Sequence, residues 1–350
     1  MSVRLLDIAR HAKVSLGVVS TVVNHSKSNT VVSPETRKRI LSAAKELGYV
    51  PNAAARSMQR GRFNRIACAV VQYGKPGTTY VPTNGYLDTA ADTLAESGYA
   101  LVLEPMHLVP VVDDFVTPPR LFKELAVDGI LGLPMTGYVP PQLDAQLARL
   151  GAPVVWLNRK PVADGQPWLY CDEAAGAQKL VRHLVGLGHR RIGYLGFSGL
   201  HYSVQDRYTA VRDAVAAAGL DTAQIALADR EASMMDEAER LLDVAPALTA
   251  VICFQRRGYD ALLHAAARRG LRVPAQLSIA YFASAWEHAG DDVRRTVVAV
   301  PEPRMAEAGV KLLLRLIDGK SAGRRPAGIP GELQVGETTV KPAAGKRLAG

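Results

Sequence analysis

The sequence predicts a small all-α headpiece at the N-terminus and a larger α/β domain after it. Apolar residues in the first 50 positions recur three and four residues apart, which is the spacing of helices with one buried face. Beyond residue 62, short apolar runs of strand length alternate with helical stretches. This alternation is typical of parallel sheets covered by helices on both faces. A chain of 350 residues, 48% of them hydrophobic, can bury a core of that kind.

The first two helices are expected between residues 5 and 24, joined by a tight turn. The buried stripe of the first helix consists of Leu5, Ile8, Ala9 and Ala12. Ser15 suits the start of the second helix, because its side-chain oxygen can accept from the unpaired backbone N–H groups of the next turn. The packing face of that helix consists of Val18, Val19, Val22 and Val23. Leu16, Gly17 and Thr21 then point outward, where a helix-turn-helix meets base edges in the major groove. An ordinary helical hairpin has the same spacing.

The distribution of charge favours the DNA-binding interpretation. The first 62 residues hold eleven lysine and arginine residues and three acidic ones, so they carry a formal charge of +8 out of the chain's +9. A positive field confined to one small domain attracts phosphate groups and makes affinity depend on salt.

A third helix and a short connecting segment complete the N-terminal part. Ser33 can cap the third helix, Pro34 fits its first position and Gly48 ends it. Its expected apolar stripe is Ile40, Leu41, Ala44 and Leu47. Residues 52–61 have high helix propensity but are too few to be helical alone in water. They form either a helix that folds against a partner or an interdomain linker.

The α/β pattern places candidate binding residues after its strands. The expected strands are 66–71, 99–103, 129–133, 153–157, 191–195, 250–254 and 277–282. The expected helices are 87–97, 174–186, 204–218, 232–242, 258–269 and 303–317. Ligands of open α/β sheets bind beyond the carboxyl ends of the strands. Asn158 and Arg159 follow one of these strands directly and are therefore candidate ligand contacts.

Several other classes of function are disfavoured. The cysteines Cys68, Cys171 and Cys253 lie singly on separate expected strands, which favours reduced core thiols over a disulfide or a zinc site, and no metal or cofactor is expected. The chain has no long apolar span, and its first residues enter the helix-turn-helix directly, so we expect a cytoplasmic protein without membrane contact.

No catalytic residues are expected. The glycine-containing segment 193–199 does not have the spacing of a phosphate-binding loop. His183, His189 and His201 lie close in sequence, but two of them fall near a helix end, where interactions with the helix terminus suffice to explain them. No arrangement of nucleophile, base and orienting group emerges, so the sequence does not indicate an enzyme.

Separate motifs along the chain resemble the LacI/GalR family of bacterial transcription regulators. In the headpiece they are Asp7-Ile8-Ala9, Val14-Ser15, Val19-Ser20, Val22-Val23-Asn24, and the runs 32–40 and 46–52. In the α/β part they are the runs 172–176, 183–192 and 270–274. The resemblance covers nearly the whole chain. It implies a headpiece at 1–50, a hinge helix or linker at 51–62, and an effector-binding and dimerisation domain at 63–340. That domain would hold two interleaved, doubly wound parallel-sheet subdomains similar to periplasmic sugar-binding proteins. The tail, 341–350, lacks heptad-spaced leucines and is expected to be disordered.

The resemblance also assigns contacts to a double-stranded DNA operator. Major-groove positions fall on Leu16, Gly17 and Thr21, and Met58 takes the place of the residue that the family wedges between base pairs of the minor groove. The full expected set is Arg4, Ser15, Leu16, Gly17, Val18, Ser20, Thr21, Asn24, Asn52, Ala55, Arg56 and Met58. Few of these side chains can pair with a base through two hydrogen bonds. We therefore expect base recognition weighted toward thymine methyl groups, backbone positioning and DNA deformability. The connection 24–32 is longer than is usual in the family.

The effector contacts implied by the resemblance depart from the family pattern. The expected set is Asn158, Arg159, Arg207, Gln255, Arg256 and Ser284. Gln255-Arg256 and Ala283-Ser284 stand where the family carries acidic residues, so the carboxylates that would hold sugar hydroxyls are expected to be missing. With Arg207 and Arg256 present, we expect an effector other than a simple neutral monosaccharide, and favour an anion.

These expectations combine into a homodimeric repressor of a pseudo-palindromic operator, controlled by a small molecule in the cleft. The alternatives are a solute-binding α/β protein and a ligand-independent DNA-binding regulator whose cleft binds nothing small. A solute-binding protein would not need the basic headpiece.

Overall fold

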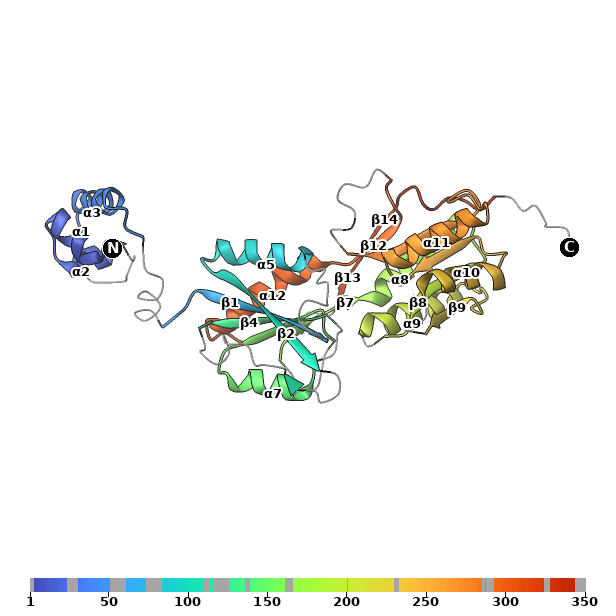
Figure 1. The fold of residues 1–350 in the computed structure, drawn as a ribbon, viewed down its shortest axis with the longest axis horizontal. Helices are drawn as coiled ribbons and strands as arrows, with labels where there is room; N and C mark the ends of the chain where they lie inside the picture. The colour runs from blue at the N-terminus through green and yellow to red at the C-terminus, as the bar shows by residue number, and fades with distance from the viewer. Residues whose placement is uncertain are drawn as a thin grey trace. The chain divides into compact units, whose positions relative to one another are not determined.

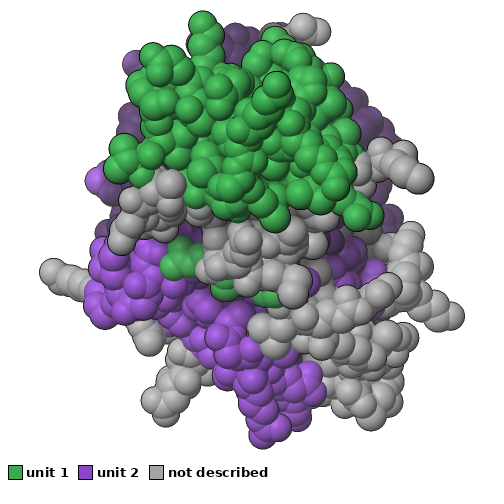
Figure 2. Space-filling model, turned by 90° about the vertical axis from the view of Figure 1, so that its left-hand side faces the viewer, with its two compact units in different colours: residues 1–64 green, residues 65–350 purple. Residues whose placement is uncertain are grey.

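The computed structural model describes residues 3–23, 31–50, 61–73, 84–109, 114–115, 126–135, 139–160, 166–199, 201–229, 233–284, 287, 293–323 and 328–343. The chain forms two compact units, residues 1–64 and 65–350 (Figure 2). The expected disorder of the tail concerns residues that mostly lie outside this description.

The first unit contains the helix-turn-helix that the sequence predicts (Figure 1). Its helices are α1 (Leu5–Ala12), α2 (Leu16–Val23) and α3 (Pro34–Glu46). Lys13 takes a left-handed conformation, with φ of 50°, and ends α1 so that the chain can turn into α2. The Ser33 side chain accepts a hydrogen bond from the Thr36 backbone N–H at 3.2 Å and caps α3.

A small apolar core joins the three helices. It consists of Ile8, Ala9, Ala12, Val19, Val22, Ile40 and Ala43. The expected stripe of α3 was wrong at Leu41, which is 48% exposed. Adjacent residues of an α-helix lie about 100° apart around its axis, so Ile40 and Ala43 share the buried face and Leu41 lies outside it.

The second unit begins with a six-stranded sheet in the order β3-β2-β1-β4-β5-β6. The strands are β1 (Arg65–Tyr73), β2 (Ala100–Val109), β3 (Asp114–Phe115), β4 (Gly129–Pro134), β5 (Val154–Leu157) and β6 (Trp168–Leu169). They are parallel except β3, which is antiparallel to β2. Helices α5 (Asn84–Glu96) and α12 (Glu302–Ile317) cover one face, and α7 (Pro141–Arg149) covers the other.

Alternating side chains of β1 supply both faces of this sheet. Ile66, Cys68 and Val70 join the core beneath α5 and α12, whereas Ala67, Ala69 and Val71 join the core beneath α7. Successive strand residues point to opposite faces, so a strand buried on both sides is apolar throughout. The continuous apolar run in the sequence therefore marks a central strand.

A second six-stranded sheet follows, in the order β14-β12-β11-β10-β8-β9. Its strands are β8 (Ile192–Phe197), β9 (Ile225–Ala228), β10 (Ala250–Cys253), β11 (Ser278–Ala283), β12 (Val297–Ala299) and β14 (Glu332–Gln334), and only β14 runs antiparallel. Helices α8 (Glu173–Leu187) and α9 (Tyr202–Ala217) cover one face, and α10 (Met234–Val244) and α11 (Arg256–Arg268) cover the other. A short parallel pair, β7 (Cys171–Asp172) and β13 (Ile329–Pro330), lies where the chain crosses between the subdomains.

Both sheets have the same parallel core, in the doubly wound order 2-1-3-4-5. The predicted α/β architecture of two doubly wound parallel-sheet subdomains is therefore confirmed. Helix α7 was not among the elements predicted from the sequence. Neither were the short strands β3, β6, β7, β9, β12, β13 and β14.

The three cysteines of the α/β unit lie in its interior. The thiols of Cys68, Cys171 and Cys253 are free and buried, as expected, and burial raises the pKa of Cys68 to about 12. Among the described helices, none is both long and apolar enough to cross a membrane.

Candidate functional site

The outward face of α2 carries the expected base-contacting positions. Leu16 is 48% exposed, and Ser15 and Gly17 are exposed, whereas Val18 and Thr21 are half-buried. The Thr21 hydroxyl donates to the Gly17 carbonyl at 2.9 Å, so its proton is engaged within the helix. The expected contacts Asn24, Asn52, Ala55, Arg56 and Met58 lie outside the described residues.

Gly17 has no packing role within the headpiece. A Cβ atom at this position would meet no other atom within 4 Å. Glycine inside a helix destabilises the protein by roughly 0.5–1 kcal/mol relative to alanine. It also permits close approach of the backbone to a ligand. Packing within the headpiece therefore does not require glycine at this position. Close approach of another molecule to α2 would explain it.

The described part of the headpiece is rich in exposed basic side chains. They are Arg4, Arg10, Lys13, Arg37, Lys38, Arg39 and Lys45. The Arg4 backbone N–H donates to the Asp7 carboxylate at 2.9 Å at the start of α1, while the Arg4 side chain remains exposed. Exposed cations of this density suit contacts with the phosphate backbone of a nucleic acid.

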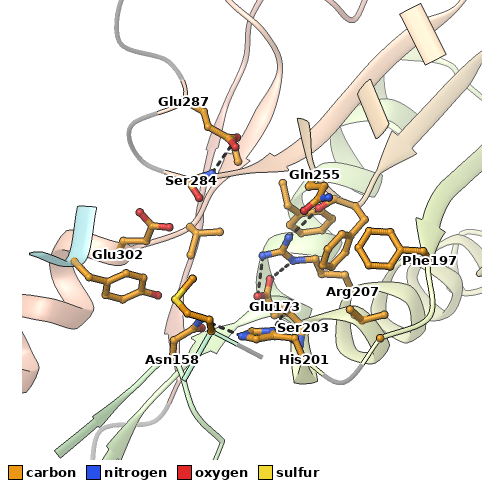
Figure 3. Close-up of a pocket in the computed structure, with 18 of the residues that line it drawn as sticks. Asn158, Glu173, Phe197, His201, Ser203, Arg207, Gln255, Ser284, Glu287 and Glu302 are labelled. Atoms are coloured by element: carbon orange, nitrogen blue, oxygen red, sulfur yellow. Dashed lines mark hydrogen bonds and ion pairs between the residues drawn. The ribbon is translucent and has the colours of Figure 1, made fainter. Parts of the chain in front are cut away.

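The α/β unit contains a pocket of about 360 Å³ where the carboxyl ends of the two sheets meet (Figure 3). Its polar lining residues are Asn158, Glu173, His201, Ser203, Arg207, Gln255, Ser284, Glu287 and Glu302. Its apolar lining includes Tyr86, Leu133, Met135, Phe197, Val204, Phe254, Phe282 and Val300. Doubly wound sheets bind ligands at this end of their strands, so the topology itself creates the pocket.

Arg207 and Glu173 form a buried ion pair in the pocket wall. The Arg207 Nε and Nη2 atoms donate to the two Glu173 carboxylate oxygens at 2.8 and 3.0 Å, and Nη1 donates to the Phe254 carbonyl at 2.8 Å. The guanidinium also stacks over the rings of Phe254 and Phe282, at 4.8 and 4.6 Å from their centroids. Burial lowers the pKa of Arg207, but attraction and hydrogen bonding by Glu173 outweigh it, so the group stays charged.

Asn158 and His201 connect the two subdomains at the pocket floor. The Asn158 amide nitrogen and His201 Nε2 are 3.0 Å apart, and the Tyr202 hydroxyl donates to the Asn158 Oδ1 atom at 2.8 Å. Asn158 directly follows β5 and has a left-handed φ of 55°, and His201 is the N-cap residue of α9. Burial and the charge of Arg207 lower the pKa of His201 to about 3, so the imidazole is neutral at physiological pH.

Four of the six expected effector residues line the pocket, and two do not. Asn158, Arg207, Gln255 and Ser284 line it. Arg159 does not line the pocket: it is buried, pairs with Asp144 at 3.0 Å and lies over the Trp156 ring.

Arg256 is also absent from the pocket lining. Its Nη1 atom donates to the Glu287 backbone carbonyl at 3.2 Å, and its Nε atom lies 3.7 Å from the Asp260 carboxylate. Arg256 and Arg159 each have an acidic partner. Neither pairing can be predicted from the position of these residues after a strand.

The pocket nevertheless contains carboxylates. Glu173, Glu287 and Glu302 line it, each from a position other than those compared with the family. Glu302 begins α12 beside the start of α5, where a side chain at Gly85 would collide with its carboxylate. The N-terminus of a helix favours a nearby negative charge. Asp172-Glu173 belongs to a motif visible in the sequence, but no local pattern singles out Glu287 or Glu302.

Known proteins resemble this chain over almost its whole length. Residues 4–52 match the bacterial regulatory proteins of the lacI family, and residues 181–339 match a periplasmic binding protein-like domain. The HTH-type transcriptional repressor PurR of Mannheimia succiniciproducens is 25% identical, over 96% of this chain and 98% of its own. The HTH-type transcriptional regulator CelR of Thermobifida fusca is 28% identical, over 90% and 92%.

Solved structures share the fold. The lac repressor dimer bound to operator and the anti-inducer ONPF superposes with a TM-score of 0.74 at 19% identity, covering 97% of this chain and all of that one. A complex of the transcriptional regulator CelR with cellobiose superposes with a TM-score of 0.62 at 26% identity, covering 96% and 99%. The basic helix-turn-helix, the paired doubly wound sheets and these relatives agree: the chain joins a DNA-binding domain of the lacI family to a periplasmic-binding-protein-like domain, as the LacI-family regulators similar to it do.

Proposed function

We propose that the protein is a homodimeric repressor that binds a pseudo-palindromic operator and responds to a small molecule in the α/β pocket. The observation that carries this proposal is the presence, in one chain, of a basic helix-turn-helix and a pocket between two doubly wound sheets. The relatives support it: PurR is named a repressor, and the lac repressor structure is a dimer on its operator. A protein that binds chromosomal DNA acts in the cytoplasm, associated with the nucleoid when bound, and an enzymatic role is not part of this proposal.

Dimer symmetry defines the proposed DNA geometry. Two copies of α2 would enter major grooves about one helical turn apart, roughly 34 Å, on a two-fold-symmetric site. Residues 51–62 would connect the headpiece of residues 1–50 to the domain of residues 63–340, and Met58 would enter the minor groove between them. A thioether is flexible enough to fill the gap between base pairs.

The pocket offers a route from the effector to DNA. Asn158 belongs to the first subdomain, and its partners His201 and Tyr202 belong to the second. Lys160 and Asp206 form a further ion pair across the same boundary, at 2.6 Å. A ligand that binds one angle between the subdomains more tightly shifts the population toward it, and the angle in turn controls how two headpieces are presented.

Selection of bound sequences from random duplex DNA tests the DNA-binding proposal. The full-length protein is expected to enrich a palindrome whose half-sites tolerate base changes more at hydrogen-bonding positions than at thymine methyl groups. The Met58→Gly variant is expected to bind the same palindrome with lower affinity. Failure to enrich any sequence, with and without small-molecule extracts, would contradict specific binding, and strict purine selection would contradict the proposed mode of recognition.

Substituting Gly17 tests whether α2 approaches DNA closely. Gly17→Ala is expected to stabilise the headpiece by about 0.5–1 kcal/mol, because alanine favours the helix and no atom occupies the space. The added methyl group should nevertheless weaken operator binding about tenfold, which is about 1.4 kcal/mol. Thermal unfolding and fluorescence anisotropy measure the two effects. Gly186→Ala, a matched change on the exposed side of α8, should stabilise the protein without altering DNA affinity. If Gly17→Ala left operator affinity unchanged, α2 would not approach the DNA closely at this position.

A further inference from the structure

The chemistry of the pocket indicates which class of effector it accepts, and this inference rests on the proposed function. We propose that the effector is a small organic cation, a protonated amine carried on a compact body. The inference replaces the sequence-based preference for an anion.

The ionisable groups of the pocket wall are mostly acidic. Among the lining residues that the structure describes, Arg207 supplies the only permanent positive charge, against the carboxylates of Glu173, Glu287 and Glu302. His201 is neutral, because its pKa is lowered to about 3. One guanidinium against three carboxylates leaves a formal charge of −2. Arg256 lies near Glu287 outside the lining, but it also lies near the Asp260 carboxylate, so this pair adds no net charge.

Arg207 is poorly placed to attract an anion. Three of its N–H donors serve Glu173 and the Phe254 carbonyl, and the Phe254 and Phe282 rings lie against the guanidinium. An anionic ligand would have to compete with Glu173 for this group. Removing one partner from a buried ion pair is strongly unfavourable, so the pair acts as part of the wall.

The acceptors for a cation lie on the side of the pocket away from that pair. Figure 3 shows Glu302, Ser284 and Glu287 together there, opposite Arg207 and Glu173. The Ser284 backbone N–H donates to a Glu287 carboxylate oxygen at 3.3 Å and orients it. An ammonium group brings three donors and no acceptor, which matches two carboxylates and a hydroxyl.

The remaining wall suits the body of such a ligand. Tyr86, Phe197 and Met135 contribute apolar surface, and the faces of aromatic rings attract cations. The volume of about 360 Å³ is at the small end of the usual range for ligand pockets. A neutral polyol could donate hydrogen bonds to the same carboxylates, but it would bring no positive charge to a described lining whose formal charge is negative. An anionic ligand would be repelled by the carboxylates of the lining.

Matched ligands that differ only in charge test the inference. The first set is glucamine, sorbitol and gluconate, and the second is phenethylamine, 2-phenylethanol and phenylacetate. Isothermal titration of the full-length protein at pH 7 is expected to give, in at least one set, an amine affinity about tenfold or more above that of the alcohol, with the acid weakest. An acid or alcohol that binds more tightly than its amine would overturn the inference, and so would the absence of binding by every compound.

Carboxamide variants locate the effect in the pocket. Glu302→Gln and Glu287→Gln should each reduce the ratio of amine to alcohol affinity about tenfold, while alcohol binding by the same protein reports that the pocket is folded. Glu307→Gln is the matched control, because Glu307 is an exposed carboxylate of the same helix that pairs with Lys311. An unchanged ratio in both pocket variants would overturn the inference.

The dependence on pH gives an independent readout. Burial raises the pKa of Glu287 above its usual value of 4.5, so acidification removes its negative charge earlier than from an ordinary glutamate. Amine affinity should therefore fall as the pH is lowered toward that raised pKa, while alcohol affinity stays constant. In Glu287→Gln this part of the pH dependence should disappear. If the affinities for amine and alcohol changed with pH in the same way, the result would count against the inference.

Operator binding measured with the same compounds separates this inference from the proposed function. If an alcohol or acid binds best and changes operator affinity, effector control stands and the cationic class is wrong. If no compound binds while the palindrome is still enriched, both the cationic class and the small-molecule control lose support, and DNA binding stands alone.

Discussion

Replacing Ile40 with alanine is expected to remove operator binding while leaving the α/β unit folded. Ile40 is fully buried in the core that joins α1, α2 and α3. Truncating a buried isoleucine to alanine destabilises a domain by about 2–5 kcal/mol. A headpiece of this size buries a small fraction of its surface and has little stability to lose, so such a loss should unfold it.

Two measurements separate unfolding of the headpiece from a general effect. Thermal denaturation should show the transition of residues 65–350 unchanged, and anisotropy should show that sequence-specific DNA binding is lost. Leu41→Ala is the control, because the neighbouring side chain is of similar size but 48% exposed. It should retain both stability and binding. Normal operator binding by Ile40→Ala would mean that the three-helix core does not determine the DNA-binding surface.

Replacing Glu173 with glutamine is expected to destabilise the α/β unit by about 3–5 kcal/mol. The carboxylate holds two N–H groups of Arg207, and both side chains are almost completely buried. A buried carboxylate can take up a proton when it loses its partner, but a guanidinium cannot lose one at any physiological pH. Glu173→Gln therefore removes the negative charge beside a fixed buried positive one: the glutamine oxygen can still accept a hydrogen bond, but it is neutral, as are the Phe254 carbonyl and the two aromatic faces.

Chemical denaturation of the full-length protein measures this loss. Glu307→Gln makes the same chemical change in an exposed pair with Lys311, and surface pairs contribute about 0–1 kcal/mol. If the two variants were equally stable, the ion pair would not be a structural element of the pocket wall, and Arg207 would be available to a ligand.

The sequence predicted the elements whose signals are local. Helix α3 could be recognised from its cap at Ser33 and its proline at the first position. Central strands such as β1 and β11 could be recognised because they are apolar on both faces. The two-residue strands β3, β6, β7 and β13 could not be, since two residues have no periodicity and their pairing depends on the sheet beside them.

The pocket was predictable in position but not in chemistry. Residues that follow parallel strands had to lie at one edge, and Asn158, Gln255 and Ser284 do. Their neighbours Arg159 and Arg256 contact acidic partners elsewhere, because adjacent residues leave a strand in different directions. The pairing of Arg207 with Glu173 joins positions 34 residues apart, and Glu302 arrives from a helix far along the chain. Contacts of this kind depend on the assembled fold.

The position of α12 has a consequence for the biosynthesis of the chain. This helix supplies Met305, Ala306, Val310 and Leu313 to the core of the sheet formed by β1 to β6, and it is made long after those strands leave the ribosome. A nascent chain must therefore hold an incomplete first subdomain, with one apolar face uncovered, until translation is almost finished. Premature termination within the second subdomain would consequently leave the first subdomain misfolded and exposed to proteases and chaperones, although every one of its strands had been translated.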